Sequence, residues 1–137
     1  MKTPVMLSLR STQRYETQEA ETLELTTEGT MEFRDGGWDI SYRESQLEGV
    51  TTTFRVEPGQ ITLTRTGPLR SEMVFRQGDS HDSLYEMPFG ALLMTVETSL
   101  LFYDIVPDGG TIDLCYRVII ENAQAGDVEY HLDIRAK

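Results

Sequence analysis

Apolar and polar residues alternate along most of this chain, and this period of two is the feature that most limits how it can fold. Successive side chains of a β-strand point to opposite faces, whereas an amphipathic helix repeats its apolar residues every three or four positions. The pattern is plainest at residues 38–43, where one parity holds Trp38, Ile40 and Tyr42 and the other holds Asp39, Ser41 and Arg43. The chain is therefore predicted to be all-β.

Turn-forming residues divide the alternating pattern into about ten short strands. Asp35-Gly36-Gly37, Pro58-Gly59, Gly67-Pro68 and Pro107-Asp108-Gly109-Gly110 are the clearest separators. The alternating segments lie near residues 5–10, 23–26, 31–33, 38–43, 50–56, 61–65, 69–75, 81–86, 91–106, 112–120 and 128–134. Strands that recur every ~8–12 residues with turn signals between them are typical of sandwiches and barrels.

A single antiparallel barrel of about ten strands, spanning residues 1–137 as one domain, is the architecture that we expect. Closing a sheet into a barrel removes its unpaired edges, whereas a sandwich leaves them exposed. Three segments are less regular. Residues 91–106 could form a helix by their leucines, but Thr95, Val96 and Tyr103 favour a strand; residues 87–90, with Pro88 and Gly90, predict a kinked strand or a corner; residues 16–21 predict a solvated loop.

Composition excludes several classes of partner. The 137 residues include 12 basic and 23 acidic side chains, for a net charge of -11 and a pI near 4.5. Nucleic acids and anionic membrane surfaces are therefore not expected to bind.

Residues 1–13 lack the pattern of a secretory signal, and the longest apolar runs, at 91–94 and 118–120, are far shorter than the roughly 20 residues of a membrane helix. Cys115 is the only cysteine; we expect it to pack as a small hydrophobic residue in a cytoplasmic protein.

Catalytic and metal chemistry find little support. Residues 80–83 read Ser-His-Asp-Ser, but neighbours on a strand face opposite ways, so a solvated junction between loop and strand is favoured over a catalytic triad. Glu129, His131 and Asp133 share one strand face and could present metal ligands, but their parity opposes the apolar row, so an exposed outer face is favoured. No metal and no cofactor are expected.

Charges on an inward-facing row are the best candidates for a binding site. Arg65 shares the parity of Ile61 and Leu63, and Glu44 shares that of Ile40 and Tyr42. An unpaired buried charge is costly, so each must reach water at the barrel rim or meet a partner or a ligand. Inward aromatic residues complete the candidate ligand-binding set with Arg65 and Glu44, although most such residues serve as core; they are Trp38, Tyr42, Phe54, Tyr85 and Tyr116.

The sequence also resembles a known family. The resemblance spans nearly the whole chain and is carried by residues 4–12, 25–29, 37–42, 83–90 and 129–134. In these segments the chain is similar to the YwiB-like family of uncharacterised calycin-type β-barrel proteins from Gram-positive bacteria. The resemblance implies a lipocalin-like barrel. It implies no activity and no binding residues.

Two functions from different classes remain open. The first is a non-enzymatic barrel that binds a small apolar or amphipathic molecule in its lumen, with Arg65 at the polar end of the ligand. The second is a protein-interaction or structural module with a lumen filled by side chains and an acidic surface that meets a basic partner. An enzyme is the least expected alternative. The state of the lumen distinguishes the first two functions.

Overall fold

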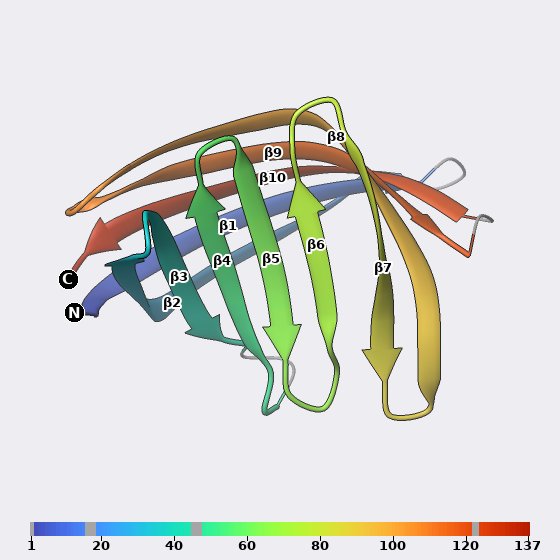
Figure 1. The fold of residues 1–137 in the computed structure, drawn as a ribbon, viewed down its shortest axis with the longest axis horizontal. Helices are drawn as coiled ribbons and strands as arrows, with labels where there is room; N and C mark the ends of the chain where they lie inside the picture. The colour runs from blue at the N-terminus through green and yellow to red at the C-terminus, as the bar shows by residue number, and fades with distance from the viewer. Residues whose placement is uncertain (1, 16–18, 45–47, 122–123) are drawn as a thin grey trace.

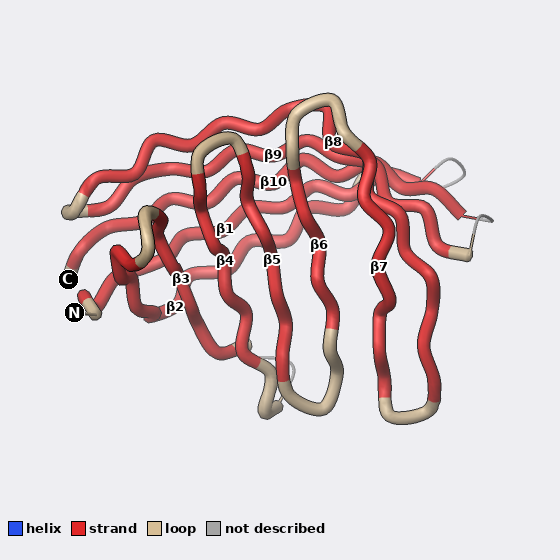
Figure 2. Tube along the Cα trace, viewed as in Figure 1, coloured by secondary structure: helices blue, strands red, loops and turns tan. Residues whose placement is uncertain are grey.

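The computed structural model describes residues 2–15, 19–44, 48–121 and 124–137, and these residues form strands without any helix (Figures 1 and 2). The strands are β1 (Thr3–Tyr15), β2 (Glu21–Arg34), β3 (Gly37–Arg43), β4 (Thr51–Glu57), β5 (Gln60–Thr66), β6 (Ser71–Phe75), β7 (Ser80–Met87), β8 (Gly90–Val106), β9 (Gly109–Ile120) and β10 (Gln124–Ala136). The all-β prediction is confirmed, and residues 91–106 form the strand that their β-branched residues favoured. No helix within the described segments is long and apolar enough to cross a membrane.

All ten strands belong to one antiparallel sheet that curls into a nearly closed barrel. Its order is β6-β5-β4-β3-β2-β1-β10-β9-β8-β7, so the first and last strands of the chain pair in the middle. The curl brings the two end strands, β6 and β7, side by side (Figure 1). There Arg70 and Glu86 exchange two backbone hydrogen bonds of 2.8 and 2.7 Å in an isolated bridge. The predicted barrel is therefore confirmed, with one incompletely paired seam.

Side chains of the inward rows pack the barrel interior. Phe54 and Phe75 are fully buried; their rings lie 5.7 Å from Tyr130 and 4.7 Å from Tyr116, respectively. The rest of the buried hydrophobic cluster comes from both halves of the sheet and consists of Val5, Leu7, Leu9, Met31, Ile40, Tyr42, Val56, Ile61, Leu63, Met73, Met94, Val96, Ile112, Leu114, Val128, Leu132 and Ile134. Each buried large apolar side chain contributes about 1.5–3 kcal/mol. This core, rather than any cross-link, holds the fold together.

β8 is the longest strand and changes register along its length. A bulge between Thr98 and Leu100 shifts its pairing with β9. Beyond the bulge the side chain of Tyr103 packs against the core, and its hydroxyl accepts a 3.0 Å hydrogen bond from the backbone N–H of Gly59 in the β4–β5 turn. A bulge bends a strand and increases its twist. Before the bulge β8 pairs with β7, and beyond it the strand reaches the β4–β5 turn through Tyr103.

Three local expectations change in the structure. Residues 23–26 and 31–33 are one strand, β2, because Gly29 continues the ladder; a Cβ there would lie 2.5 Å from the carbonyl oxygen of Ser41. Residues 87–90 do not kink a strand: β7 ends at Met87 and β8 begins at Gly90, so Pro88 lies in a tight hairpin turn. The predicted loop at 16–21 ends earlier, since Glu21 starts β2, and residues 16–18 lie outside the described part.

Candidate functional site

Arg65 and Glu44 meet inside the barrel wall. Arg65 lies near the end of β5, and Glu44 follows the last residue of β3. The Nε atom of Arg65 is 3.7 Å from Oε2 of Glu44, and the side chains are 24% and 14% exposed. The hydroxyl of Thr52, which is fully buried on β4, donates a hydrogen bond to the same carboxylate oxygen. Arg65 and Glu44 therefore each have a partner of opposite charge within the protein.

The pair lies at the centre of a polar row that crosses four neighbouring strands. Strand pairing sets Tyr42 of β3 opposite Thr52, Thr52 opposite Arg65, and Arg65 opposite Ser71 of β6. All four point to the inner face, because their parity is that of the buried residues on each strand. The barrel therefore carries a belt of polar groups at one level, next to the seam.

Two tyrosine hydroxyls border this belt. Burial raises the pKa of Tyr42, the negative charge of Glu44 raises it further, and the charge of Arg65 opposes the change. Burial also raises the pKa of Tyr130 well above its ordinary value. The two hydroxyls are close enough to influence each other, but among the described residues no hydrogen bond of normal geometry reaches Tyr130 Oη. Both phenols stay protonated at neutral pH and act as neutral hydrogen-bonding groups.

The seam next to Arg65 opens into a hollow of about 490 Å³. The Arg70–Glu86 bridge closes one end of the seam, and the turn in which the N–H of Asp79 donates to the carbonyl of Arg76 closes the other. Side chains of β5, β6 and β7, together with Arg70 just before β6, line the hollow, and Leu84 is its only hydrophobic member: Thr64, Arg65, Thr66, Arg70, Ser71, Glu72, His81, Asp82, Ser83, Leu84 and Glu86. The hollow is therefore polar, in contrast to the core beside it.

Three buried polar atoms at this hollow have no hydrogen-bond partner in the structure. They are Ser71 Oγ, His81 Nδ1 and Ser83 Oγ, which are three of the six such atoms among the described residues. Ser71 is only 5% exposed, and His81 and Ser83 pair with the buried residues Val96 and Met94 of β8. Leaving a buried polar group unpaired costs about 1–3 kcal/mol. Three such groups beside a polar hollow indicate a site where a polar ligand would supply the missing hydrogen bonds.

Ser71 was not among the candidates predicted from the sequence, and His81 and Ser83 were considered only as part of the Ser-His-Asp-Ser run. Ser71 shares the parity of Met73 and Phe75, and that signal could have placed it on the inner face. Residues 80–83 lie at the start of β7, at the expected junction between loop and strand; Ser80 and Asp82 are exposed, but His81 and Ser83 are partly buried. The weak apolar content of β7 concealed its inner row, since Tyr85 is its only large inward residue with a described side chain.

The aromatic candidates divide between different levels of the barrel. Tyr42 lies in the polar belt, whereas Phe54 and Tyr116 are buried in the core. Trp38 pairs with Val56 at the other end of β3 and β4 and meets the exposed Phe33 edge to face at 5.0 Å. Tyr85 is partly buried on β7. Of the predicted set, the structure brings together Arg65, Glu44 and Tyr42.

Comparison with known proteins places the chain in a family. The family described as a domain of unknown function, DUF1934, matches residues 7–132. The chain belongs to the DUF1934 family. It is 26% identical over 132 residues to the uncharacterized β-barrel protein YwiB of Bacillus subtilis (strain 168), covering 96% of this chain and 89% of that protein. The resemblance noted from the sequence is thus confirmed.

A solved structure supports the fold independently. The crystal structure of the YwiB protein from Bacillus subtilis superposes with a TM-score of 0.82 at 22% sequence identity, covering 96% of this chain and 92% of the other. The ten-stranded, nearly closed barrel is therefore shared between the two DUF1934 proteins.

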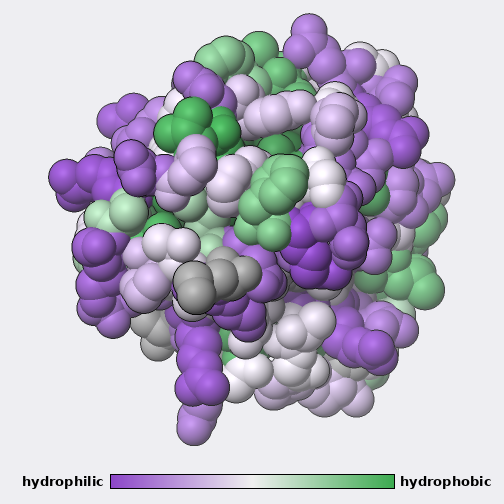
Figure 3. Space-filling view, turned by 60° about the vertical axis from the view of Figure 1, so that its left-hand side comes forward, coloured by the Kyte–Doolittle hydropathy of each residue, from purple (hydrophilic) through white to green (hydrophobic). Residues whose placement is uncertain are grey.

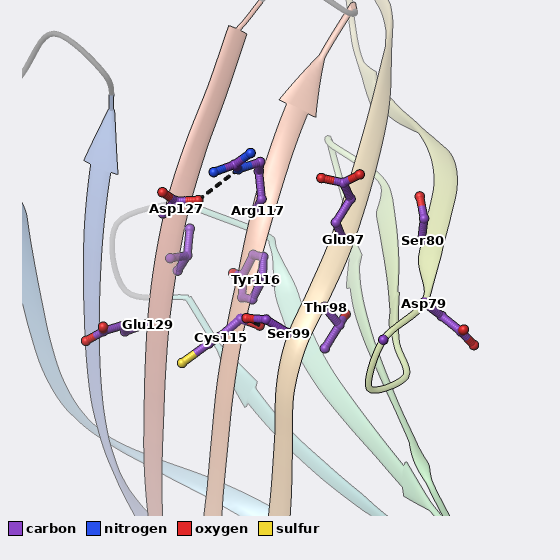
Figure 4. A pocket seen from close by; sticks show the side chains of 12 residues that line it. Asp79, Ser80, Glu97, Thr98, Ser99, Cys115, Tyr116, Arg117, Asp127 and Glu129 are labelled. Carbon is purple, nitrogen blue, oxygen red and sulfur yellow. Dashed lines mark hydrogen bonds and ion pairs between the residues drawn. The ribbon is translucent and has the colours of Figure 1, made fainter.

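The outer wall of the DUF1934 barrel carries a second hollow, of about 440 Å³, beside the β8 bulge (Figure 4). Arg117 of β9 and Asp127 of β10 form a 3.0 Å ion pair there, next to Glu97 of β8. Cys115 also lines this hollow. Cys115 was expected to pack as a small hydrophobic residue, but it is only partly buried, because its parity on β9 is opposite to that of the buried Leu114 and Tyr116. Burial and the nearby Glu129 raise the pKa of its thiol, which disfavours the reactive thiolate.

His131 lies on the outer wall, as predicted. Its Nδ1 is 2.5 Å from Asp113 Oδ1, and its Nε2 is 3.0 Å from Asp133 Oδ2. The hydrogen bond with Asp113 raises the pKa of His131, and Asp133 adds to the effect. Within the described residues, no group of three His, Cys, Asp or Glu side chains has an arrangement that could hold a metal ion. Both nitrogens of this imidazole are occupied by structural partners.

Proposed function

We propose that this protein is a non-enzymatic binding protein that holds a small molecule at the seam between β6 and β7, with Arg65 at the polar end of the ligand. The observation that carries the proposal is the set of unpaired buried atoms on Ser71, His81 and Ser83 around a hollow of about 490 Å³. Small-molecule sites have volumes of ~300–1,000 Å³ and a few convergent polar groups.

The arrangement of the seam residues supports binding rather than catalysis. A nucleophile needs a base within hydrogen-bonding reach, and that base needs an orienting group. His81 faces inward with its Nδ1 unpaired, whereas Asp82 faces outward and accepts a 2.7 Å hydrogen bond from Thr95. The Ser-His-Asp-Ser run is therefore divided between two faces of β7, and no catalytic relay is assembled from it.

The proposed ligand lies in the wall of the barrel rather than along its axis. Phe54, Phe75 and the other buried side chains occupy the interior, while the seam offers space and polar partners beside Arg65. The packed interior argues against the ligand site in the lumen that the sequence-based hypothesis gave, and the proposal retains only the inward Arg65 of that hypothesis. The seam position also favours a polar molecule, because Leu84 is the only hydrophobic residue of the lining.

Native mass spectrometry of the purified protein, followed by calorimetric titration with the co-purifying molecule, tests the proposal. Arg65→Ala should weaken binding by about 10- to 100-fold, the equivalent of the ~1.5–3 kcal/mol of a charge-assisted hydrogen bond. His131→Ala on the outer wall is the control and should leave affinity unchanged. Equal affinities of the Arg65→Ala and wild-type proteins would remove the seam site from consideration.

A second function, a protein-interaction module, is supported by a different observation. The interior is packed, as such a module requires, and the chain carries a net charge of -11. Hydrophilic side chains cover much of the face seen in Figure 3. An acidic exterior of this kind favours a basic protein partner. Absence of any co-purifying molecule, together with a chemically cross-linked basic partner whose binding weakens as salt is raised, would favour this function over the first.

A further inference from the structure

The inner side of the seam offers hydrogen-bond donors. Arg65 has five guanidinium N–H donors, and Glu44 is its only ion-pair partner among the described residues, at 3.7 Å from Nε. Ser71 lies opposite Arg65 on the next strand, and its hydroxyl is buried and unpaired. Ser83 adds a second unpaired hydroxyl. A guanidinium with nearby hydroxyls is the chemistry that binds a carboxylate.

The outer side of the same hollow is acidic. Glu72 of β6 and Glu86 of β7 are exposed, and within the described part of the chain neither forms a salt bridge. Asp82 adds a third carboxylate, and Arg70 is the only cation on this rim. The rim therefore carries three negative charges against one positive charge. A positively charged group at the mouth of the hollow would be stabilised there.

Charge complementarity distinguishes three classes of ligand. A simple anion would have to pass the acidic rim of a protein whose net charge is -11. A simple cation would meet Arg65 inside and leave the buried hydroxyl of Ser71 without an acceptor. A small molecule with an anionic end and a cationic end satisfies both sides of the seam.

We infer that the seam binds a small zwitterion of the α-amino acid type. Its carboxylate lies inward against Arg65 and Ser71, and its ammonium group lies outward between Glu72 and Glu86. This inference rests on the proposed function, and it adds the chemical class and the orientation of the ligand. The unpaired hydroxyl of Ser71, itself 5% exposed and lining the hollow, is the observation that links the acidic rim to a ligand.

Titration of the full chain with each common α-amino acid, followed by ligand-observed nuclear magnetic resonance, is the first test. For the amino acid that binds most tightly, the N-acetyl derivative removes the ammonium charge and the carboxamide derivative removes the carboxylate. Each derivative should bind about tenfold more weakly or worse, since each lacks one charge-assisted contact. Equal binding of either derivative, or no binding by any amino acid, would contradict the zwitterion.

Matched charge variants provide the second test. The Glu72→Gln/Glu86→Gln protein should bind the amino acid about 2- to 10-fold more weakly, in keeping with exposed ion pairs, and should bind the N-acetyl derivative unchanged. Glu24→Gln/Glu129→Gln removes two exposed charges from β2 and β10 and should change neither affinity. Equal weakening by the two double variants would attribute the effect to net charge and overturn the proposed orientation.

Sodium phosphate and sodium acetate separate this inference from the function on which it rests. If either anion binds in a manner that depends on Arg65 while the amino acids do not bind, the zwitterion is wrong and the seam site stands. If amino acids, phosphate and acetate all fail to bind, and native mass spectrometry finds the chain alone, both the inference and the proposed function are wrong.

Discussion

Two buried threonines of this barrel have opposite hydrogen-bonding states. Thr52 is fully buried and donates to Glu44, which also pairs with Arg65. Thr98 is 4% exposed, and its hydroxyl has no hydrogen-bond partner in the described part of the chain. The contribution of a buried hydroxyl to stability depends on whether it forms a hydrogen bond. The same substitution should therefore change stability differently at these two positions.

Thr52→Val should destabilise the protein by about 1.5–3 kcal/mol, because it removes a hydrogen bond to a charged group and leaves Glu44 less satisfied. Thr98→Val is the matched control and should be neutral or stabilising, since valine has the same shape and removes an unpaired polar atom. Urea denaturation of the two variants and the wild type gives the comparison. A larger loss for Thr98→Val than for Thr52→Val would contradict the assigned hydrogen bonds.

The stability of the fold should depend on pH through His131 on the outer wall. Its folded-state pKa is raised, chiefly by the hydrogen bond with Asp113, so protonation stabilises the fold. This contribution is complete below the unfolded pKa of about 6.5 and is lost as pH rises through the folded pKa. The wild type should therefore exceed His131→Asn in stability by more at pH 5.5 than at pH 9, as measured by urea denaturation at each pH. A difference that grows with pH would contradict this assignment.

At the scale of elements, β6 and β7 are joined far less completely than any other neighbouring pair in the sheet. Every other pair of strands that lie side by side forms a ladder, interrupted by the bulge between Thr98 and Leu100 of β8, whereas within the described residues β6 and β7 share only the Arg70–Glu86 bridge. Successive amides of a strand point to opposite edges. The backbone N–H of Arg70 points across the seam, so the N–H groups of Glu72 and Val74 point across it too. On β7 the N–H of Glu86 points across the seam, so those of Leu84 and Asp82 do as well.

Hydrogen exchange should therefore distinguish the seam from the rest of the barrel. The amides of Glu72 and Leu84 should exchange at least tenfold faster than those of Ile112 and Leu132, which pair with each other in the β9–β10 ladder. The amides of Arg70 and Glu86 should show intermediate protection. Nuclear magnetic resonance at constant pH gives the rates residue by residue. Protection of Glu72 equal to that of Leu132 would mean that the seam is closed by a full ladder.

At the scale of the whole molecule, the excess of acidic side chains is the feature from which we predict partners. The 23 acidic and 12 basic residues leave a net charge of -11. Basic side chains near the wall pair with acids, as Arg55 does with Asp39 at 3.3 Å and Lys137 does with Glu28 at 2.5 Å. Among the residues that the structure describes, paired cations of this kind do not offer the free basic stripe on which binding to a phosphate backbone depends.

Neither DNA nor RNA should bind this protein at physiological salt, because association would bring together two negatively charged surfaces. Gel-shift assays with double-stranded DNA and single-stranded RNA provide the measurement. Lowering the salt should still give no complex, since repulsion between like charges strengthens as screening falls. A complex of micromolar affinity, stronger at low salt, would show that a local basic site overrides the net charge.

The local pattern of the sequence was enough to predict the strands, their inward faces and several turns. Asp35 and Gly36 illustrate this, with φ values of 52° and 79° in the turn that the sequence predicted between β2 and β3. Arg65 and Glu44 were predicted to lie on inner rows, because parity depends only on position along one strand. Gly29 was misread as a boundary, since its role is the close approach of Ser41, a residue of the next strand.

The tertiary structure decided where the seam lies and which residues come together at it. Alternation does not tell which strands become neighbours when a sheet closes, because closure depends on the accumulated twist and curl of all ten strands. Ser71, His81 and Ser83 line one hollow because β6 and β7, which follow each other in the chain but lie at opposite ends of the sheet order, come side by side there without forming a ladder. The sequence by itself determined the faces and the charge of this protein; the curvature of the closed sheet decided where its polar site could form.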